Sequence, residues 1–244
     1  MTGFSYRWAS GTDVGRARDH NEDAVWPEGS GDTAEELVIA VADGMGGHIG
    51  GEIASSVAME AAASAVGGGA EERVRIANLA VIDRILEQPR LAGMGTTLTL
   101  AVLGGDGSMD LAHIGDSRAY LLRDGTLQRL TRDHSLVAEM IESGELDPAA
   151  ASSHPFRSVI TRALGMERNV DVDTSDHRLE PGDRVLLCSD GLTNMVEEDD
   201  IAGIAGDAES PGDAVWGLIA AANQAGGIDN ISVVAADAAS DAGG

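Results

Sequence analysis

Hydrophobic residues along the chain fall into two patterns: short apolar runs, and longer segments with helical spacing. The short runs are rich in Val, Leu, Ile and Ala and end at turn residues, which predicts β-strands. The predicted strands are Phe4–Ser10, Leu37–Ala42, Thr96–Leu103, Met109–Ile114, Ala119–Arg123, Asp183–Cys188 and Ile231–Ala236. Because only the short link Gly115–Arg118 separates Met109–Ile114 from Ala119–Arg123, these two strands are expected to form a β-hairpin.

Between the strands lie segments with the character of helices. Ala70–Gln88 carries Val74, Ala77, Val81 and Ile85 at the spacing of one helical face. The other predicted helices are Glu52–Val66, Leu136–Ser143 and Asp213–Gln224. Helices that come in pairs, rather than after every strand, favour antiparallel sheets with helices packed outside over a doubly wound parallel sheet.

Composition narrows the class of protein. The chain has 244 residues, 43% of them hydrophobic, and 41 acidic residues against 16 basic ones, for a formal charge of −25. A surface with this net negative charge repels the phosphate backbone of nucleic acids, which argues against nucleic-acid binding. The same charge suits a protein that concentrates divalent cations.

Other sequence features bear on where the protein works. The lone cysteine, Cys188, excludes an internal disulfide, and the sequence contains neither a signal-peptide pattern nor an apolar run of transmembrane length. We therefore expect a cytoplasmic protein without a membrane segment. We also expect a monomer, because nothing in the sequence predicts a large exposed apolar stripe. The sequence leaves open whether the chain is a fragment of a longer protein.

Four aspartates lie at the ends of predicted strands. Asp23 and Asp229 come just before apolar runs, whereas Asp43 and Asp190 come directly after them. In an antiparallel pair the start of one strand lies beside the end of its neighbour, so all four side chains can meet at one rim of the sheets.

Gathered carboxylates repel one another, and a divalent cation removes that repulsion. Oxygen ligands without cysteine or clustered histidine favour Mg²⁺ or Mn²⁺ over Zn²⁺. The alternative is that Asp43-Gly44 and Asp190-Gly191 only mark turns.

Arg18 lies near these acids in sequence. An ion pair between Arg18 and a metal ligand would be wasteful, so we expect Arg18 to hold a phosphate in a bidentate manner. The alternative is that Arg18 is only a surface charge.

A set of short motifs occurs in the order found in one enzyme family. The motifs are Arg18–Asp23, Val41–His48, Gly93–Leu98, His113–Tyr120, Leu130–Ser135, Ile160–Gly165, Cys188–Leu192 and Asp229–Asn230. Together they span nearly the whole chain and resemble the metal-dependent protein phosphatase family, the type-2C-like phosphatases, in its compact bacterial form. The resemblance implies an α+β fold, a four-layer αββα sandwich of two antiparallel sheets flanked by helix pairs, with a metal centre in a cleft at one end.

The resemblance also implies an organisation of the chain. Residues 1–240 would form a single catalytic domain with a flap at about residues 136–157, and residues 241–244 would be a frayed tail. From its weak periodicity alone, the flap region could equally be an ordinary surface loop.

Metal ligands follow from the resemblance residue by residue. Asp43 would bridge two core ions of Mn²⁺ or Mg²⁺, and Asp190 and Asp229 would complete the first ion. The carbonyl of Gly44 and, through water, Glu22 would serve the second.

Five further positions have implied or open roles. Asp23 would belong to the metal centre directly or through water, and Asp116 would help to bind a third, weaker ion. Arg18 would bind the phosphate. His48 is a candidate proton donor, because Met45 stands where some family members have a histidine after Asp-Gly. His134, by contrast, is more typical of a residue that stabilises its loop.

The implied activity is hydrolysis of phosphoserine and phosphothreonine in proteins, the substrates of a Ser/Thr kinase, by direct attack of a metal-bridging hydroxide. Three alternatives stay open. The chain could be a catalytically weak module that binds phosphoproteins, a phosphatase dedicated to one phosphorylated regulator, or a structural protein that binds divalent cations.

Overall fold

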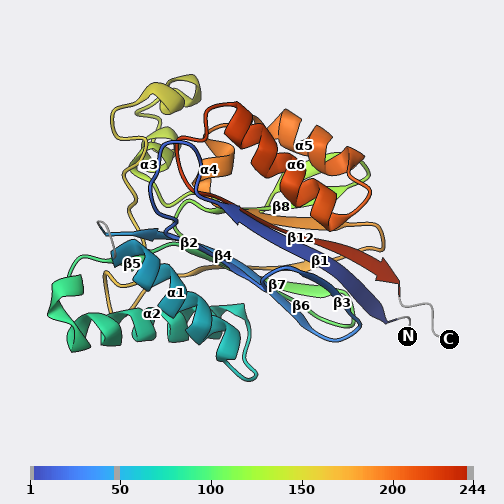
Figure 1. Ribbon diagram of the computed structural model, residues 1–244, viewed down its shortest axis with the longest axis horizontal. Coiled ribbons are helices and arrows are strands. Elements are labelled where there is room, and N and C mark those ends of the chain that lie inside the picture. The colour runs from blue at the N-terminus through green and yellow to red at the C-terminus, as the bar shows by residue number, and fades with distance from the viewer. Residues whose placement is uncertain (1–2, 47–49, 241–244) are drawn as a thin grey trace.

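Two antiparallel sheets lie face to face at the centre of the molecule. The computed structural model describes residues 3–46 and 50–240, and within them helices cover the outer face of each sheet (Figure 1). The first sheet has the order β3-β1-β12-β11-β8-β9, and the second has the order β10-β7-β6-β4-β2 with the short β5 paired to β4. The four-layer sandwich implied by the family resemblance is therefore confirmed.

The strands of the first sheet are β1 (Phe4–Asp13), β3 (Ser30–Thr33), β8 (Arg118–Arg123), β9 (Thr126–Arg129), β11 (Arg184–Cys188) and β12 (Ile231–Ser240). Those of the second are β2 (Asp23–Trp26), β4 (Leu37–Met45), β5 (Gly95–Thr96), β6 (Leu98–Leu103), β7 (Ser108–Ile114) and β10 (Asp173–Arg178). All seven predicted strands exist, and one of them, Thr96–Leu103, is divided into β5 and β6.

Strands at the sheet edges escaped prediction. β3, β9 and β10 each lie at an edge of a sheet, and none of their residues is buried. An edge strand packs less of its surface into a core than a central strand does, so its sequence carries a weaker apolar signal.

The predicted hairpin between Met109–Ile114 and Ala119–Arg123 is wrong. β7 pairs with β6 and β10 in the second sheet, whereas β8 pairs with β9 and β11 in the first. The link between them crosses from one sheet to the other, and Gly115 makes the turn with a φ of 109°. Two neighbouring apolar strands have the same sequence pattern whether they pair with each other in a hairpin or belong to two different sheets. The pattern alone therefore could not exclude the hairpin.

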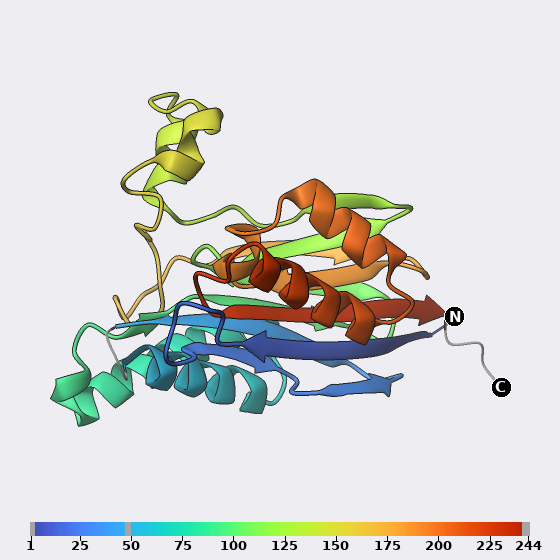
Figure 2. The same ribbon diagram turned by 45° about the horizontal axis from the view of Figure 1, so that its top comes forward.

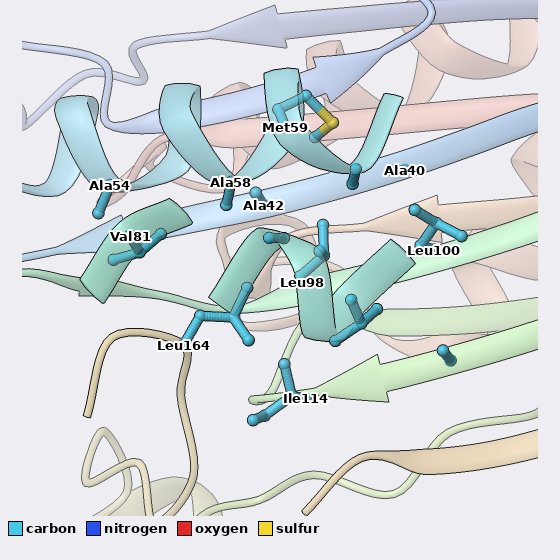
Figure 3. Close-up of a cluster of buried hydrophobic side chains, with 14 of the residues drawn as sticks. Ala40, Ala42, Ala54, Ala58, Met59, Val81, Leu98, Leu100, Ile114 and Leu164 are labelled. Atoms are coloured by element: carbon cyan, nitrogen blue, oxygen red, sulfur yellow. The ribbon is translucent and has the colours of Figure 1, made fainter. Parts of the chain in front are cut away.

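Successive side chains of the central strands point to opposite faces of the sheet and so belong to different core layers. In β4, Ile39 and Val41 face the core between the two sheets, while Ala40 and Ala42 face the helices. These alanines pack against small residues of α1 such as Ala58, which lets the helix approach the sheet closely (Figure 3).

Helix pairs form the outer layers. α1 (Gly50–Ser64) and α2 (Ala70–Glu87) cover the second sheet, and α5 (Glu198–Asp207) and α6 (Pro211–Gln224) cover the first. The short α4 (Asp190–Thr193) follows β11. α5 had not been predicted: its acidic first turn resembles plain solvated surface, but acids there favour a helix N-terminus. No helix in the described ranges is long and apolar enough to cross a bilayer.

Residues 136–157, here called the flap segment, leave the sandwich. They contain α3 (Leu136–Glu142) and the 3₁₀ helix Pro148–Ser153, and they project away from both sheets (Figure 2). The segment leaves and returns at one place, because Leu136 N–H donates to the carbonyl of Val159 at 2.8 Å. The predicted tail, residues 241–244, lies outside the described residues.

Replacing Ile39 by Ala should show that the core between the sheets holds the two halves together. Ile39 is completely buried, so Ile39→Ala should lower the free energy of unfolding by about 2–5 kcal/mol, because it leaves a cavity. Ile76 on α2 is 38% exposed, and Ile76→Ala should change the same quantity by only about 0.5 kcal/mol. Urea denaturation of both variants is the measurement; equal losses would contradict this description of the core.

Candidate active site

Acidic residues from both sheets meet at one end of the sandwich. Asp23 and Asp43 lie opposite each other across the β2–β4 pair, as expected for a strand start beside a strand end. Asp190 follows β11 and Asp229 precedes β12, and these two strands are also paired. Asp116 lies in the link that crosses between the sheets.

An open cleft of about 1730 Å³ lies at this end. Of the residues predicted for the site, its lining includes Arg18, Glu22, Asp43, Gly44, Asp116, Asp190 and Asp229. The flap segment forms one wall with residues such as Ile141 and Arg157. The geometry therefore brings together most of the predicted site, while His48 lies outside the described residues.

Asp23 lies behind the cleft rather than in its lining. The hydroxyl of Ser189 donates to Asp23 Oδ2 at 2.8 Å. Burial raises the pKa of Asp23 to about 7, although hydrogen bonds from Ser232 and Ser189 oppose the rise. Of the two roles left open by the sequence, this position fits contact through water better than direct ligation.

Burial and mutual repulsion disfavour negative charge in the cleft. The pKa of Asp43 is raised well above its usual value by burial and then by Asp23 and Asp190. Burial, with Asp190 beside it, also raises the pKa of Asp116 to about 8. The pKa of Asp190 is raised by burial and by Asp229. Such a cluster calls for a positive charge among its members.

Several carboxylate oxygens in the cleft have no hydrogen-bond partner among the described residues. Glu22 Oε1, Asp116 Oδ1 and Asp190 Oδ1 are buried and unpaired. An unpaired buried carboxylate oxygen is costly, and a divalent cation would satisfy it. In the described ranges, no three acidic, histidine or cysteine side chains are already arranged to hold an ion. The fit to Mg²⁺ or Mn²⁺ therefore rests on the unpaired oxygens and on the all-oxygen donor set.

In both Asp-Gly pairs the glycine is required because neighbouring backbone leaves no room for a side chain, and not because the chain makes a tight turn there. Neither Gly44 nor Gly191 has a positive φ. A Cβ on Gly44 would lie 2.5 Å from the carbonyl oxygen of Glu22, and one on Gly191 would lie 1.9 Å from that of Asn230. These contacts bring the acid-bearing backbones together, which disfavours the interpretation of Asp43-Gly44 and Asp190-Gly191 as simple turn markers.

Arg18 makes an ion pair that the sequence argument had considered wasteful. Its Nη2 lies 2.7 Å from Asp229 Oδ2, and half of its side chain is exposed. The hydrogen bond to Asp229 raises the pKa of Arg18 further. A guanidinium has five N–H donors, so the others stay available to a ligand in the cleft.

Asn230 holds the Arg18 loop against the site, a role that sequence reasoning missed. Its Nδ2 donates to the carbonyls of Val14 and His20 at 3.0 and 2.9 Å, and its Oδ1 accepts from Glu22 N–H at 2.8 Å. An asparagine next to an acid at a strand start was the available signal, since such side chains bond readily to backbone.

His134 was predicted to stabilise its own loop, and in the structure it joins that loop to the Gly115 turn, because His134 N–H donates to the carbonyl of Gly115 at 2.7 Å. The ring is buried, and its Nδ1 accepts a hydrogen bond from Gly115 N–H at 3.1 Å. The histidine therefore stabilises the turn that carries Asp116.

Comparison with known families gives one clear match. The model of the family described as protein phosphatase 2C matches residues 10–224. The serine/threonine phosphatase stp of Listeria welshimeri is 37% identical over 235 residues, which cover 91% of this chain and 92% of that protein. The serine/threonine protein phosphatase PstP of Mycobacterium tuberculosis is 40% identical over 239 residues, 95% of this chain but 45% of the longer relative.

Solved structures agree with these relatives. The crystal structure of the M. tuberculosis phosphatase PstP/Ppp has a TM-score of 0.86 and 38% identity, and the match covers 96% of this chain and 98% of that one. The catalytic domain of PstP in complex with two manganese ions has a TM-score of 0.85 and 36% identity, with 97% and 99% covered.

The carboxylate cluster should make the protein in EDTA less stable as the pH rises. Because the folded-state pKa values of Asp23 and Asp116 are raised to about 7 and about 8, the folded state binds more protons than the unfolded state. The free energy of unfolding should therefore fall between about pH 4 and pH 8. Asp43→Asn removes a repelling charge, so its stability should fall less steeply over this range. Chemical denaturation at a series of pH values tests this, and an equal or steeper fall in the variant would contradict the electrostatic account.

Proposed function

The chain belongs to the protein phosphatase 2C family, and from this membership we propose that it is a metal-dependent phosphatase acting on phosphoserine and phosphothreonine in proteins. The observation that carries the proposal is the set of buried, unpaired carboxylate oxygens of Glu22, Asp116 and Asp190 beside the half-exposed Arg18. The relative from L. welshimeri, which this chain matches over nearly its whole length, is named a serine/threonine phosphatase and supports the proposal.

Seven residues would hold the ions, with Glu22 and Asp23 acting through water. They are Glu22, Asp23, Asp43, Gly44, Asp116, Asp190 and Asp229. Two core ions of Mn²⁺ or Mg²⁺ are supported by the two manganese ions in the PstP structure, and Asp116 with Asp190 would serve a third. When bound, these ions would supply positive charge and a water molecule acidic enough to act as a nucleophile near neutral pH.

The protein's own groups then prepare the substrate. Arg18 lines the cleft, and the guanidinium N–H donors that Asp229 does not use would bind phosphoryl oxygens in a bidentate manner, which would orient the phosphate for attack. Asn230 fixes the loop that carries Arg18. Hydrolysis transfers the phosphoryl group to water and needs a proton for the leaving serine or threonine oxygen; His48 is our candidate donor.

The shape of the cleft suits a protein substrate. It is open, has a volume of about 1730 Å³ and is walled on one side by the flap segment. A phosphorylated side chain can therefore reach the acidic cluster while the chain around it stays outside. We further propose that residues 1–240 form one catalytic domain that works as a monomer in the cytoplasm, reversing the action of a Ser/Thr kinase in signalling. The single, buried Cys188 is compatible with a reducing compartment.

Hydrolysis should depend on the metal and on the aspartates that hold it. Turnover of p-nitrophenyl phosphate and of a phosphothreonine peptide should vanish in EDTA and return with Mn²⁺ or Mg²⁺. Asp43→Ala and Asp190→Ala should each lower kcat/KM roughly 100-fold or more while the protein stays folded, because a strong electrostatic group is lost from the site. Asp83→Ala, on the exposed surface of α2, is the matched control and should behave as wild type.

Two results would contradict this proposal. Near-normal turnover by Asp43→Ala or Asp190→Ala would place the chemistry elsewhere. A folded wild-type protein that binds the phosphopeptide with each metal but never hydrolyses it would identify a binding module instead.

Arg18 should act on the phosphate rather than on the metal. Arg18→Ala should lower kcat/KM for the phosphopeptide roughly 10-fold or more, because a bidentate contact to the phosphoryl group is lost. Mn²⁺ affinity measured by calorimetry should not fall, since Asp229 loses only a competing cation. Arg18→Lys keeps the charge but not the planar fork, so it should restore only part of the activity. Unchanged kinetics in Arg18→Ala would show that the residue is only a surface charge.

A further inference from the structure

Two hydroxyl groups that the proposed chemistry does not use lie between the segments that carry Asp43 and Asp116. Thr97 and Ser117 are both completely buried, and their Oγ atoms are 2.8 Å apart. Thr97 comes directly before β6 and Ser117 directly before β8. The pair therefore connects the two sheets at the end where the cleft opens.

Thr97 holds the peptide of Asp43 on both sides. Asp43 N–H donates to Thr97 Oγ1 at 2.9 Å, and Thr97 N–H donates to the carbonyl of Asp43 at 2.9 Å. In a regular antiparallel pair the two residues exchange backbone hydrogen bonds. Here the hydroxyl of Thr97 takes the place of its carbonyl as acceptor, at the register position of the acid. The sheet thus gives up a backbone bond for one that a single side chain controls.

The other half of the pair belongs to the turn that carries Asp116. Ser117 follows Asp116 directly, and its carbonyl accepts from Thr99 Oγ1 at 3.2 Å. A Cβ on Gly115 would lie 2.4 Å from Cγ2 of Thr97, so the methyl group of Thr97 packs tightly against the same turn. One side chain therefore touches the backbone at both acids, with its hydroxyl toward Asp43 and its methyl toward Gly115.

Both acids need such support because they repel each other. The carboxylates of Asp43 and Asp116 are close enough to interact, and both also interact with Asp190. Repulsion would widen a soft turn and move Asp116 away from the cleft. Thr97 and Ser117 are completely buried, so water cannot replace their hydrogen bonds when one hydroxyl is removed.

We propose that the Thr97–Ser117 hydroxyl pair fixes the separation of Asp43 and Asp116 and so sets the affinity of the cleft for divalent cations. The inference rests on the proposed metal-dependent function. Thr97 and Ser117 are positioning residues: they act through the backbone of the acids and touch neither ion nor substrate.

Calorimetric titration of the full, substrate-free chain with Mn²⁺ tests the proposal. Thr97→Val keeps the shape of the side chain but removes the hydroxyl, and it should weaken Mn²⁺ binding about 10-fold, the size typical of losing an outer-shell partner. Thr97→Ser restores the hydroxyl and should bind Mn²⁺ almost as wild type. Because the two hydroxyls act as one unit, adding Ser117→Ala to Thr97→Val should cost little more than Thr97→Val alone.

A matched control separates positioning from general stability. Ser10 is also buried and donates to the carbonyl of Pro27 at 2.6 Å, in β1 and outside the lining of the cleft. Ser10→Ala should lower the melting temperature without changing Mn²⁺ affinity.

Three outcomes would overturn the inference, and a separate outcome would overturn the proposed function on which it rests. Wild-type Mn²⁺ affinity in folded Thr97→Val would overturn it, as would an equal loss of affinity in Ser10→Ala. Should Thr97→Val fail to fold, Ser117→Ala alone decides, and unchanged affinity there overturns the inference as well. A wild-type protein that binds no Mn²⁺ would overturn the proposed function itself, whereas binding that no substitution alters would remove only the role of the hydroxyl pair.

Discussion

Repulsion among buried carboxylates at one end of the sandwich is the constraint on which the rest of the structure depends. Asp43, Asp116 and Asp190 each resist ionisation because of burial and because of one another. A fold that gathers them must hold their backbones firmly and must receive a compensating positive charge. The close approach of Gly191 to Asn230 supplies the first requirement, and the unpaired oxygens create the second.

Much of the fold could be predicted because the central strands are buried on both faces. Leu37–Ala42 is such a run, and it forms the first part of β4, which lies between α1 and the first sheet. The edge strands β3 and β10 lack this signal, since they bury almost nothing. The link at Gly115 was predicted to form a hairpin because the sequences of two adjacent strands do not indicate which sheet each strand joins. Only the strand pairing in the structure, of β7 with β6 and of β8 with β11, shows that the link crosses between the sheets.

The candidate site shows the same division between local and tertiary information. The placement of Asp23 beside Asp43 followed from strand starts and ends, and the structure confirms it. The ion pair of Arg18 with Asp229 joins residues 211 positions apart, and no local pattern announces it. Asn230 and Thr97 act through hydrogen bonds to distant backbone, so their support of the acids could not be predicted from spacing.

The central claim is that this acidic end of the sandwich is a binuclear or trinuclear site for divalent cations. Anomalous diffraction from crystals grown with Mn²⁺, recorded just above the manganese absorption edge, tests it most directly. The account predicts at least two anomalous peaks in the cleft, with Asp43 shared between them and Asp190 and Asp229 on one. A map of well-ordered crystals with no peak within reach of Asp43, or with manganese only elsewhere on the surface, would contradict it.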